Sequence, residues 1–351
     1  MSRTAVVLFN LGGPDSPAAV APFLFNLFFD PAIIRLPTPL RWLLARLISR
    51  RRAPVAQEIY REMGGGSPLL PNTEAQAQAL TAALHAQGLG EAKVFIAMRY
   101  WHPRARKTVR DVAAFAPDEV VLLPLYPQYS TTTSASSVKE WQREAKAAGL
   151  TAPTRSLCCY PQEEGFVETV VEGLRRALRS LDHDKPPRVL FSAHGLPKKI
   201  VEQGDPYQWQ VEQSVAAVVH RLGEVNLDWQ ICYQSRVGPL EWIGPATDSE
   251  IEKAAAAGRP IVVVPIAFVS EHSETLVELD IEYRQLAEKH GAPAYLRVAT
   301  AGAEAAFIEG LARLVRQALG SDRPVCSNAG GRFCPAEWRG CAQVSELAAA
   351  G

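Results

Sequence analysis

Apolar and polar positions follow two periods along this chain. Short runs of consecutive apolar, often β-branched residues alternate with longer stretches in which apolar residues recur every three or four positions. A continuous apolar run is typical of a strand buried on both faces, and the longer period is typical of an amphipathic helix. The expected strands are Ala5–Leu11, Val94–Tyr100, Val120–Leu125, Arg188–Ala193, Gln230–Gln234, Ile261–Phe268 and Tyr295–Val298. The expected helices include Glu74–Gln87, Ser136–Ala148, Gly165–Ser180, Gln208–Leu222 and Asp248–Ala256.

This alternation predicts an α/β fold with two Rossmann-like, doubly wound domains, because buried strands separated by helices form parallel sheets. We expect an N-terminal domain over 1–125, closed by a returning helix at about 303–319, and a C-terminal domain over 126–302. Ligands of such sheets bind at the carboxyl ends of the strands, so we expect the site in an interdomain cleft.

Two segments depart from the alternation. The apolar stretch Phe23–Phe29 precedes a basic, amphipathic candidate helix over Leu40–Arg52. That helix is either a surface helix whose arginine stems cover apolar area or a contact for a membrane or a large apolar ligand. The tail over 320–351 shows no helix or strand period before Val344 and carries three of the six cysteines.

Composition narrows the function classes. The 351 residues are 47% hydrophobic and 21% charged, with 37 basic and 37 acidic side chains, so a general nucleic-acid binder is not expected. No apolar window is long enough to span a membrane, and the first residues enter a strand pattern without a leader sequence. We expect a cytoplasmic protein, with peripheral attachment to the inner face of the membrane through residues 23–52 as an option. Nothing in the sequence specifies an oligomeric state.

The most informative chemical feature is a row of three glutamates, Glu274, Glu278 and Glu282, directly after the apolar run Pro260–Phe268. In an α-helix this spacing places the three carboxylates within roughly 80° of one face. Like charges repel there, so a divalent cation or a proton relay is expected to compensate, although a solvated acidic face is the simpler alternative.

His194 directly follows the strand ending at Ala193, and a histidine and a glutamate at neighbouring strand ends can bind a divalent metal or move protons. We therefore predict that His194 and Glu274 act together. His272 lies two residues before Glu274, and two helical residues point in different directions, so His272 is expected in the preceding loop in a supporting role on the same path.

Cys326, Cys334 and Cys341 lie within sixteen residues, at a spacing unlike that of a zinc site. With Cys158, or its neighbour Cys159, they would supply four thiolates for an iron–sulfur cluster; the alternative is a set of unrelated reduced thiols.

Several segments together resemble the ferrochelatase family, over about residues 5–318. The resemblance is carried by Leu11-Gly-Gly-Pro14, Gly64-Gly-Gly-Ser-Pro68, Tyr126-Pro-Gln-Tyr-Ser130, Ser192-Ala-His-Gly-Leu-Pro197, Gly204-Asp-Pro-Tyr207, Gln234-Ser-Arg-Val-Gly-Pro239 with Trp242, and Val264–Tyr283. It implies insertion of Fe²⁺ into protoporphyrin IX, with the release of two protons. It further implies that His194 and Glu274 handle metal and protons, that Glu278 and Glu282 extend the acidic row, and that Arg52, Tyr60, Ser67 and Trp242 contact the porphyrin.

The resemblance leaves alternatives open. A [2Fe–2S] cluster is found in some relatives, but this tail lacks the close C-x2-C spacing of the animal enzymes. A chelatase acting on coproporphyrin or inserting cobalt, and a haem or metal carrier without turnover, are the alternative functions.

Overall fold

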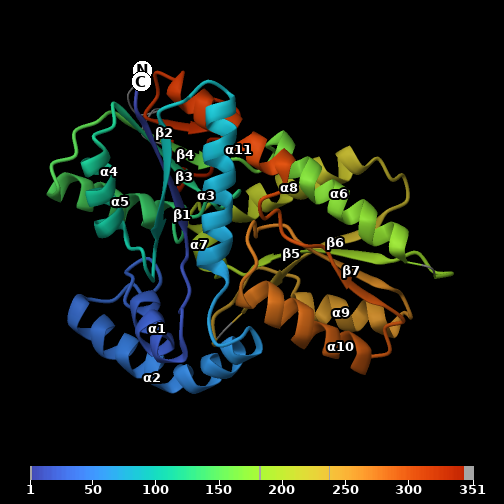
Figure 1. Cartoon of the computed structure of the whole chain (residues 1–351). Coiled ribbons are helices and arrows are strands. Elements are labelled where there is room, and N and C mark those ends of the chain that lie inside the picture. Colours follow the sequence, from blue (N-terminus) through green and yellow to red (C-terminus); the bar gives the residue numbers. More distant parts are fainter. Residues whose placement is uncertain (1, 182, 237, 344–351) are drawn as a thin grey trace. The chain divides into compact units, whose positions relative to one another are not determined.

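The computed structural model describes residues 2–181, 183–236 and 238–343. By its contacts, the chain forms two compact units (Figure 1). The first comprises Met1–Cys159 and Ala312–Gly331, and the second comprises Tyr160–Leu311 and Arg332–Gly351. The first unit therefore extends beyond the expected boundary at residue 125. The reason is that a strand over Thr154–Cys159 pairs with the sheet of that unit.

The first unit is built on a five-stranded parallel sheet of order β2-β1-β3-β4-β9. Its strands are β1 (Thr4–Asn10), β2 (Ala92–Met98), β3 (Glu119–Pro124), β4 (Thr154–Cys159) and β9 (Val325–Ser327). β1 is buried at every position, as its uninterrupted apolar pattern predicts. The pattern missed β4 and β9, the second of which lies in the tail that shows no strand period. β9 is three residues long, too short to produce a period, and it exists because β4 offers it a partner.

Helices of the first unit cover its sheet and form a separate apolar lip. They are the short 3₁₀ turn η1 (Pro17–Ala19), α1 (Val20–Phe28), α2 (Thr38–Glu62), α3 (Leu69–Ala86), α4 (Ala105–Phe115) and α5 (Ser134–Ala147). α4 and α5 bury Val109, Val112 and Trp141 against the strands. α1 and α2 pack on each other around Phe23, Leu24 and Tyr60, and α2 is longer than the helix expected over Leu40–Arg52.

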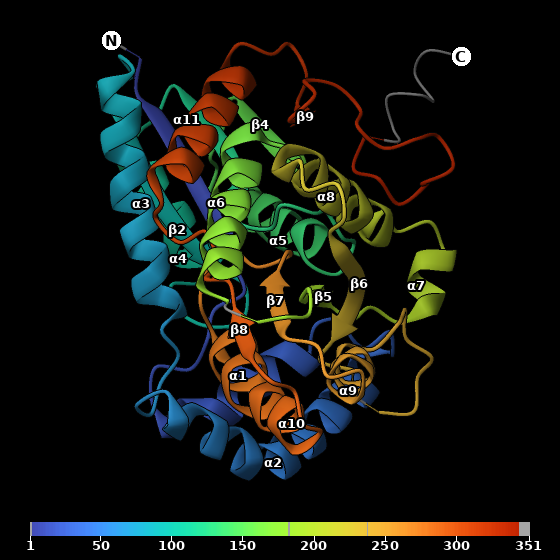
Figure 2. The ribbon, with the colours of Figure 1, turned by 90° about the vertical axis from the view of Figure 1, so that its right-hand side faces the viewer.

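The second unit has a four-stranded parallel sheet of order β6-β5-β7-β8 with helices on both faces (Figures 1 and 2). The strands are β5 (Arg188–His194), β6 (Asp228–Gln234), β7 (Ile261–Pro265) and β8 (Tyr295–Arg297). The helices are α6 (Glu164–Ser180), α7 (Lys198–Glu202), α8 (Tyr207–Leu222), α9 (Thr247–Ala256), α10 (Tyr283–Lys289) and α11 (Ala305–Leu319), the last of which continues into the first unit. The predicted class of two parallel-sheet α/β domains is confirmed.

The glutamate row lies on a π-helix over Glu274–Glu282 rather than on the expected α-helix. A π-helix closes i→i+5 bonds, with roughly 4.4 residues per turn, so positions four apart still lie near one another. The three carboxylates therefore share one face in either geometry.

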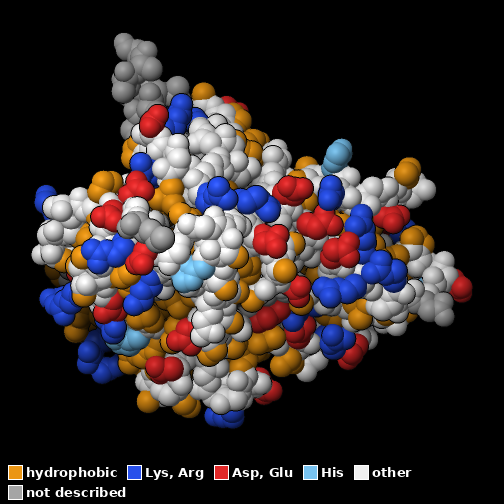
Figure 3. Space-filling model, turned by 45° about the horizontal axis from the view of Figure 1, so that its top comes forward, with side chains coloured by type: hydrophobic (Ala, Val, Ile, Leu, Met, Phe, Trp, Pro, Cys, Tyr) orange, Lys and Arg blue, Asp and Glu red, His pale blue; other side chains and the backbone are white. Residues whose placement is uncertain are grey.

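Among the described residues, no helix is both long and apolar enough to cross a membrane. On the face drawn in Figure 3, basic and acidic side chains are interspersed, in keeping with the equal numbers of the two charges in the sequence.

Candidate active site

His194 and Glu274 meet in the second unit. His194 is the last residue of β5, and Glu274 begins the π-helix that follows the neighbouring strand β7. Since β5 and β7 are parallel and adjacent, their carboxyl ends lie at one edge of the sheet. His194 Nε2 lies 3.5 Å from Glu274 Oε1, and both side chains are partly exposed, at 42% and 25%.

His272 completes a three-residue arrangement around the Glu274 carboxylate. Its Nε2 lies 3.5 Å from Glu274 Oε2, so each carboxylate oxygen faces one imidazole. His272 precedes the helix, as expected, and its backbone N–H donates to Thr275 Oγ1 at 3.0 Å. Because it is not helical, the expectation that helical geometry would separate it from Glu274 does not apply.

Both imidazoles have one nitrogen directed at a backbone carbonyl. His194 Nδ1 lies 2.6 Å from the oxygen of Gly195, and His272 Nδ1 lies 3.1 Å from that of Ser270. A carbonyl oxygen only accepts, so the proton of each neutral ring is favoured on Nδ1. The Nε2 atom of each neutral ring then carries a lone pair that faces the carboxylate side and is free to take a proton or a metal ion.

The electrostatics of Glu274 follow from these neighbours. Burial opposes ionisation of its carboxyl. The charge of His194, together with the hydrogen bond and charge of His272, outweighs that effect and lowers the pKa of Glu274 to about 2. The carboxylate is therefore held anionic when the imidazoles are charged.

Glu278, one step along the row, is compensated by neutral donors rather than by a cation. It accepts hydrogen bonds from Gln234 Nε2 at 2.9 Å, from the Ser235 N–H at 2.8 Å, from the Ser235 hydroxyl, and from Tyr283 Oη at 3.0 Å. Ser235 has a φ of 58°, a left-handed conformation that a serine adopts at a cost. That conformation aims its N–H and its hydroxyl at the same carboxylate.

Glu282, at the end of the row, is exposed. Burial and then the charge of Glu278 raise the pKa of its carboxyl. The row therefore runs from a strongly anionic carboxylate at Glu274 to a more readily protonated one at the surface.

Gln234, Tyr207 and Ser235 were missed as individual site residues. The Gln234 amide donates to the carbonyl oxygen of Glu274 at 2.9 Å as well as to Glu278, and Tyr207 Oη donates to the carbonyl oxygen of His194 at 3.1 Å. All three stand in segments that resemble the family, which was the available signal. Their roles depend on contacts between distant segments.

The predicted porphyrin contacts are distributed between the units. Trp242 belongs to the second unit and lies over Gly195, where a Cβ atom would approach the indole ring to 3.2 Å. Its buried Nε1 has no hydrogen-bond partner within the described ranges. In the first unit Arg52 is exposed on α2, with its guanidinium 5.9 Å from the centre of the Phe28 ring, and Tyr60 is buried.

Ser67 lies where two glycine-containing loops meet in the first unit. Its N–H donates to the Pro14 oxygen at 2.7 Å, and a Cβ atom on Gly13 would overlap the Ser67 side chain. The glycines of both motifs thus permit close approach of the two loops.

The cysteines expected to bind a cluster are divided between the two units. Cys158 Sγ and Cys159 Sγ lie 3.4 Å apart, and Cys326 stands on the adjacent strand β9 of the same unit. In the second unit a hydrogen bond from Cys334 lowers the pKa of Cys341 to about 6, against the effect of burial. In the part of the chain that the structure describes, no three or more His, Cys, Asp or Glu side chains are arranged to hold a metal ion.

Comparison with known proteins identifies the family. The ferrochelatase family profile matches residues 3–319. The chain is 54% identical to a ferrochelatase of Caulobacter vibrioides over 340 residues, 97% of each chain, and 55% identical to one of Phenylobacterium zucineum over 341 residues, 97% of this chain and 98% of the relative. A ferrochelatase of Rickettsia bellii is 47% identical over 342 residues, 97% of this chain and 94% of the relative.

Solved structures show the same fold at low identity. SirB from Bacillus subtilis with Fe³⁺ aligns with a TM-score of 0.50 and 13% identity, covering 91% of this chain and 96% of SirB. CbiX, described as the terminal enzyme of sirohaem biosynthesis in denitrifying bacteria, also gives 0.50, with 15% identity, 91% of this chain and all of CbiX.

Proposed function

The chain belongs to the ferrochelatase family, and we propose that its reaction centre is the His194–Glu274 pair. The enzyme inserts Fe²⁺ into a porphyrin, a step in which four N–Fe bonds form, two N–H bonds break and two protons leave. The observation that carries the assignment is the 3.5 Å approach of His194 Nε2 to Glu274 Oε1 at the edge of the sheet.

The two groups divide the work. The charge of the imidazolium that forms beside Glu274 lowers the pKa of its carboxyl to about 2, so the carboxylate stays anionic, stabilises that imidazolium and attracts Fe²⁺. His194 has a Nε2 lone pair when neutral, so it accepts a pyrrole proton, and His272 supports the carboxylate from the other side. Protons then pass outward along Glu278 and Glu282, the last of which is exposed.

The substrate is protoporphyrin IX rather than coproporphyrin, and this proposal is supported by the apolar lip of α1 and α2. Arg52 is suited to a propionate because a guanidinium binds a carboxylate with two parallel hydrogen bonds. Trp242 offers a rigid ring beside Gly195 and an N–H that has no partner among the described residues. A higher kcat/KM with the tetracarboxylate coproporphyrin than with protoporphyrin would contradict this choice.

Residues 23–52 also support peripheral attachment to a membrane from the cytoplasmic side. Leu40, Trp42, Leu43 and Leu47 are 44–61% exposed on α2, among arginines of the same helix. An apolar face flanked by basic side chains binds anionic lipid surfaces. Cosedimentation with vesicles containing phosphatidylglycerol, and its loss in a Trp42→Ser, Leu43→Ser double variant, tests this attachment.

The expected [2Fe–2S] centre on Cys158, Cys326, Cys334 and Cys341 stays a proposal, and it requires these thiols to gather, because the described residues bring no three metal-binding side chains together. The hydrogen bond between Cys334 and Cys341 and the lowered pKa of Cys341 favour thiolate, the form that binds iron. When bound, the group would supply a low-potential one-electron centre. Visible absorption of the purified protein that disappears in Cys334→Ser supports the cluster, and a colourless, active wild type removes it.

The experiment for the reaction centre is steady-state insertion of Fe²⁺ under anaerobic conditions. His194→Ala is expected to lower kcat by 10²- to 10⁴-fold, the usual contribution of a proton-transfer group. His220→Ala, an exposed histidine near the end of α8, is the matched control and is expected to keep the parental rate. Parental activity in His194→Ala would overturn the assignment.

A further inference from the structure

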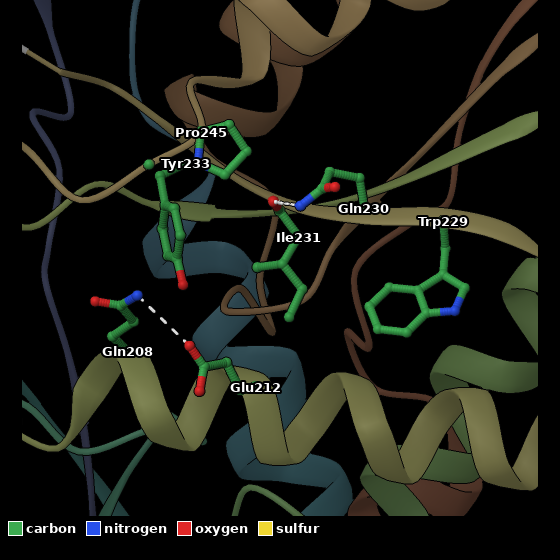
Figure 4. Close-up of a pocket in the computed structure, with 8 residues that line it drawn as sticks. Gln208, Glu212, Trp229, Gln230, Ile231, Tyr233 and Pro245 are labelled. Carbon is green, nitrogen blue, oxygen red and sulfur yellow. Dashed lines mark hydrogen bonds between the residues drawn. The ribbon is translucent and has the colours of Figure 1, made fainter.

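A pocket outside the reaction centre lies in the second unit, between α8 and the edge strand β6. It has a volume of about 330 Å³, and its walls include Gln208, Glu212, Trp229, Ile231, Tyr233 and Pro245 (Figure 4). None of these residues belongs to the reaction centre described above. The pocket is at the small end of the range of ligand sites in proteins, so its occupant is a small molecule.

The Tyr233 hydroxyl points to a missing partner in this pocket. The residue is only 2% exposed, and its hydroxyl is buried without a hydrogen-bond partner among the residues that the structure describes. In Figure 4 the ring extends from β6 toward α8, with the hydroxyl facing the side of Gln208 and Glu212. Buried hydroxyls in native proteins nearly always have a partner, so a bound group is expected to supply one.

The charge of the pocket lining indicates that the bound group is positively charged. Glu212 is the one charged residue of its lining. Burial raises the pKa of Tyr233, and the charge of Glu212 raises it further, so the two groups are close although no hydrogen bond joins them. The Gln208 amide contacts the carboxylate only at 3.5 Å. A hydrogen-bond donor placed between the Tyr233 hydroxyl and the Glu212 carboxylate would give both groups a partner.

The remaining wall is apolar and rigid. Trp229 is 39% exposed, yet its ring is held edge-on against Phe191, with centroids 6.1 Å apart. Ile231 and Pro245 add aliphatic surface. A pocket lined by an indole ring and a carboxylate favours an organic cation, because a ring face attracts positive charge and the carboxylate neutralises it.

We propose that this pocket binds a small organic ammonium ion, a protonated amine with an aromatic or aliphatic body. The ammonium group donates to the Glu212 carboxylate and to the Tyr233 oxygen, and the body lies against Trp229.

The test is calorimetric titration of the full chain with phenethylammonium. Two ligands of similar shape are the controls: 3-phenylpropionate, which carries a negative charge, and phenethyl alcohol, which is neutral. The amine is expected to bind with one-to-one stoichiometry, at least tenfold more tightly than either control. Glu212→Gln is expected to weaken it at least tenfold, and Tyr233→Phe severalfold.

Glu224→Gln, at an exposed position just after α8 and outside the pocket, is expected to bind as the parent does. Thermal unfolding of each variant shows that it is folded. The proposal is overturned if the amine does not bind, if the acid binds as well as the amine, or if Glu212→Gln leaves the affinity unchanged. Binding is expected to survive in His194→Ala, so the result does not depend on the proposed reaction centre.

Discussion

Gln234 connects the two catalytic segments, and replacing it by leucine is a sharp test of the site. Its buried amide donates to the Glu274 carbonyl and to Glu278 Oε2, each at 2.9 Å. Its oxygen accepts from the Ser192 hydroxyl at 2.8 Å. Leucine has a similar volume and makes none of these bonds, so the substitution removes the polar link with little change in packing.

The structure shows which partners lose most. The Ser192 hydroxyl keeps a contact with Thr247 Oγ1 at 2.9 Å, and Glu278 keeps its bonds from Ser235 and Tyr283. The net loss is therefore one neutral and one charged hydrogen bond, about 3 kcal/mol in all. A factor of ten in rate corresponds to about 1.4 kcal/mol. If half or all of the loss appears in the transition state, kcat falls by about tenfold to a hundredfold.

The assay is anaerobic Fe²⁺ insertion, with kcat and the KM for porphyrin measured separately. We expect kcat to fall and KM to change less than twofold, because Gln234 positions the carboxylate that meets metal and protons. The control is Gln162→Leu, an exposed glutamine of the same unit far along the chain from these segments. A folded Gln234→Leu protein with kcat within twofold of the parent would refute the positioning role.

Two further predictions concern stability. Gly165→Ala is expected to destabilise the second unit by about 1–3 kcal/mol in urea unfolding, because a Cβ atom there would overlap the Ala306 carbonyl. This overlap outweighs the roughly 1 kcal/mol by which alanine is preferred over glycine in a helix. The control Gly320→Ala meets only ordinary contacts and should be nearly neutral, so equal behaviour of the two variants would contradict the overlap. Burial opposes ionisation of Glu271, but the charge of Arg297 outweighs this effect and lowers the pKa of its carboxyl. The ionised Glu271 therefore adds to the free energy of unfolding at pH values above the ordinary glutamate pKa. This stabilisation is lost as the pH falls through the pKa that Glu271 has in the folded protein. Glu271→Gln should therefore be less stable than the parent at pH 7, with a difference that shrinks on acidification; a constant difference would show that the charge is not responsible.

The sequence by itself determined the fold class and the central pair of the site. Runs such as Ile261–Pro265 are apolar at every position, and only a strand covered on both faces buries them completely. Parallel neighbouring strands end at one edge, so residues that follow two such strands, His194 and Glu274, were expected to meet. The motifs around them were specific enough to indicate the family.

The tertiary structure decided the details that depend on contacts between distant segments. Positions four apart share a face in an α-helix and in a π-helix, so the glutamate row could not distinguish the two. Two of the residues that donate to Glu278, Gln234 and Ser235, lie at the end of β6, and β9 is a strand only because β4 pairs with it. Likewise, only the packing of β6 on α8 leaves the Tyr233 hydroxyl buried and without a partner among the residues that the structure describes. Local sequence periods carry no information on such pairings, because each is fixed by where another part of the chain comes to lie.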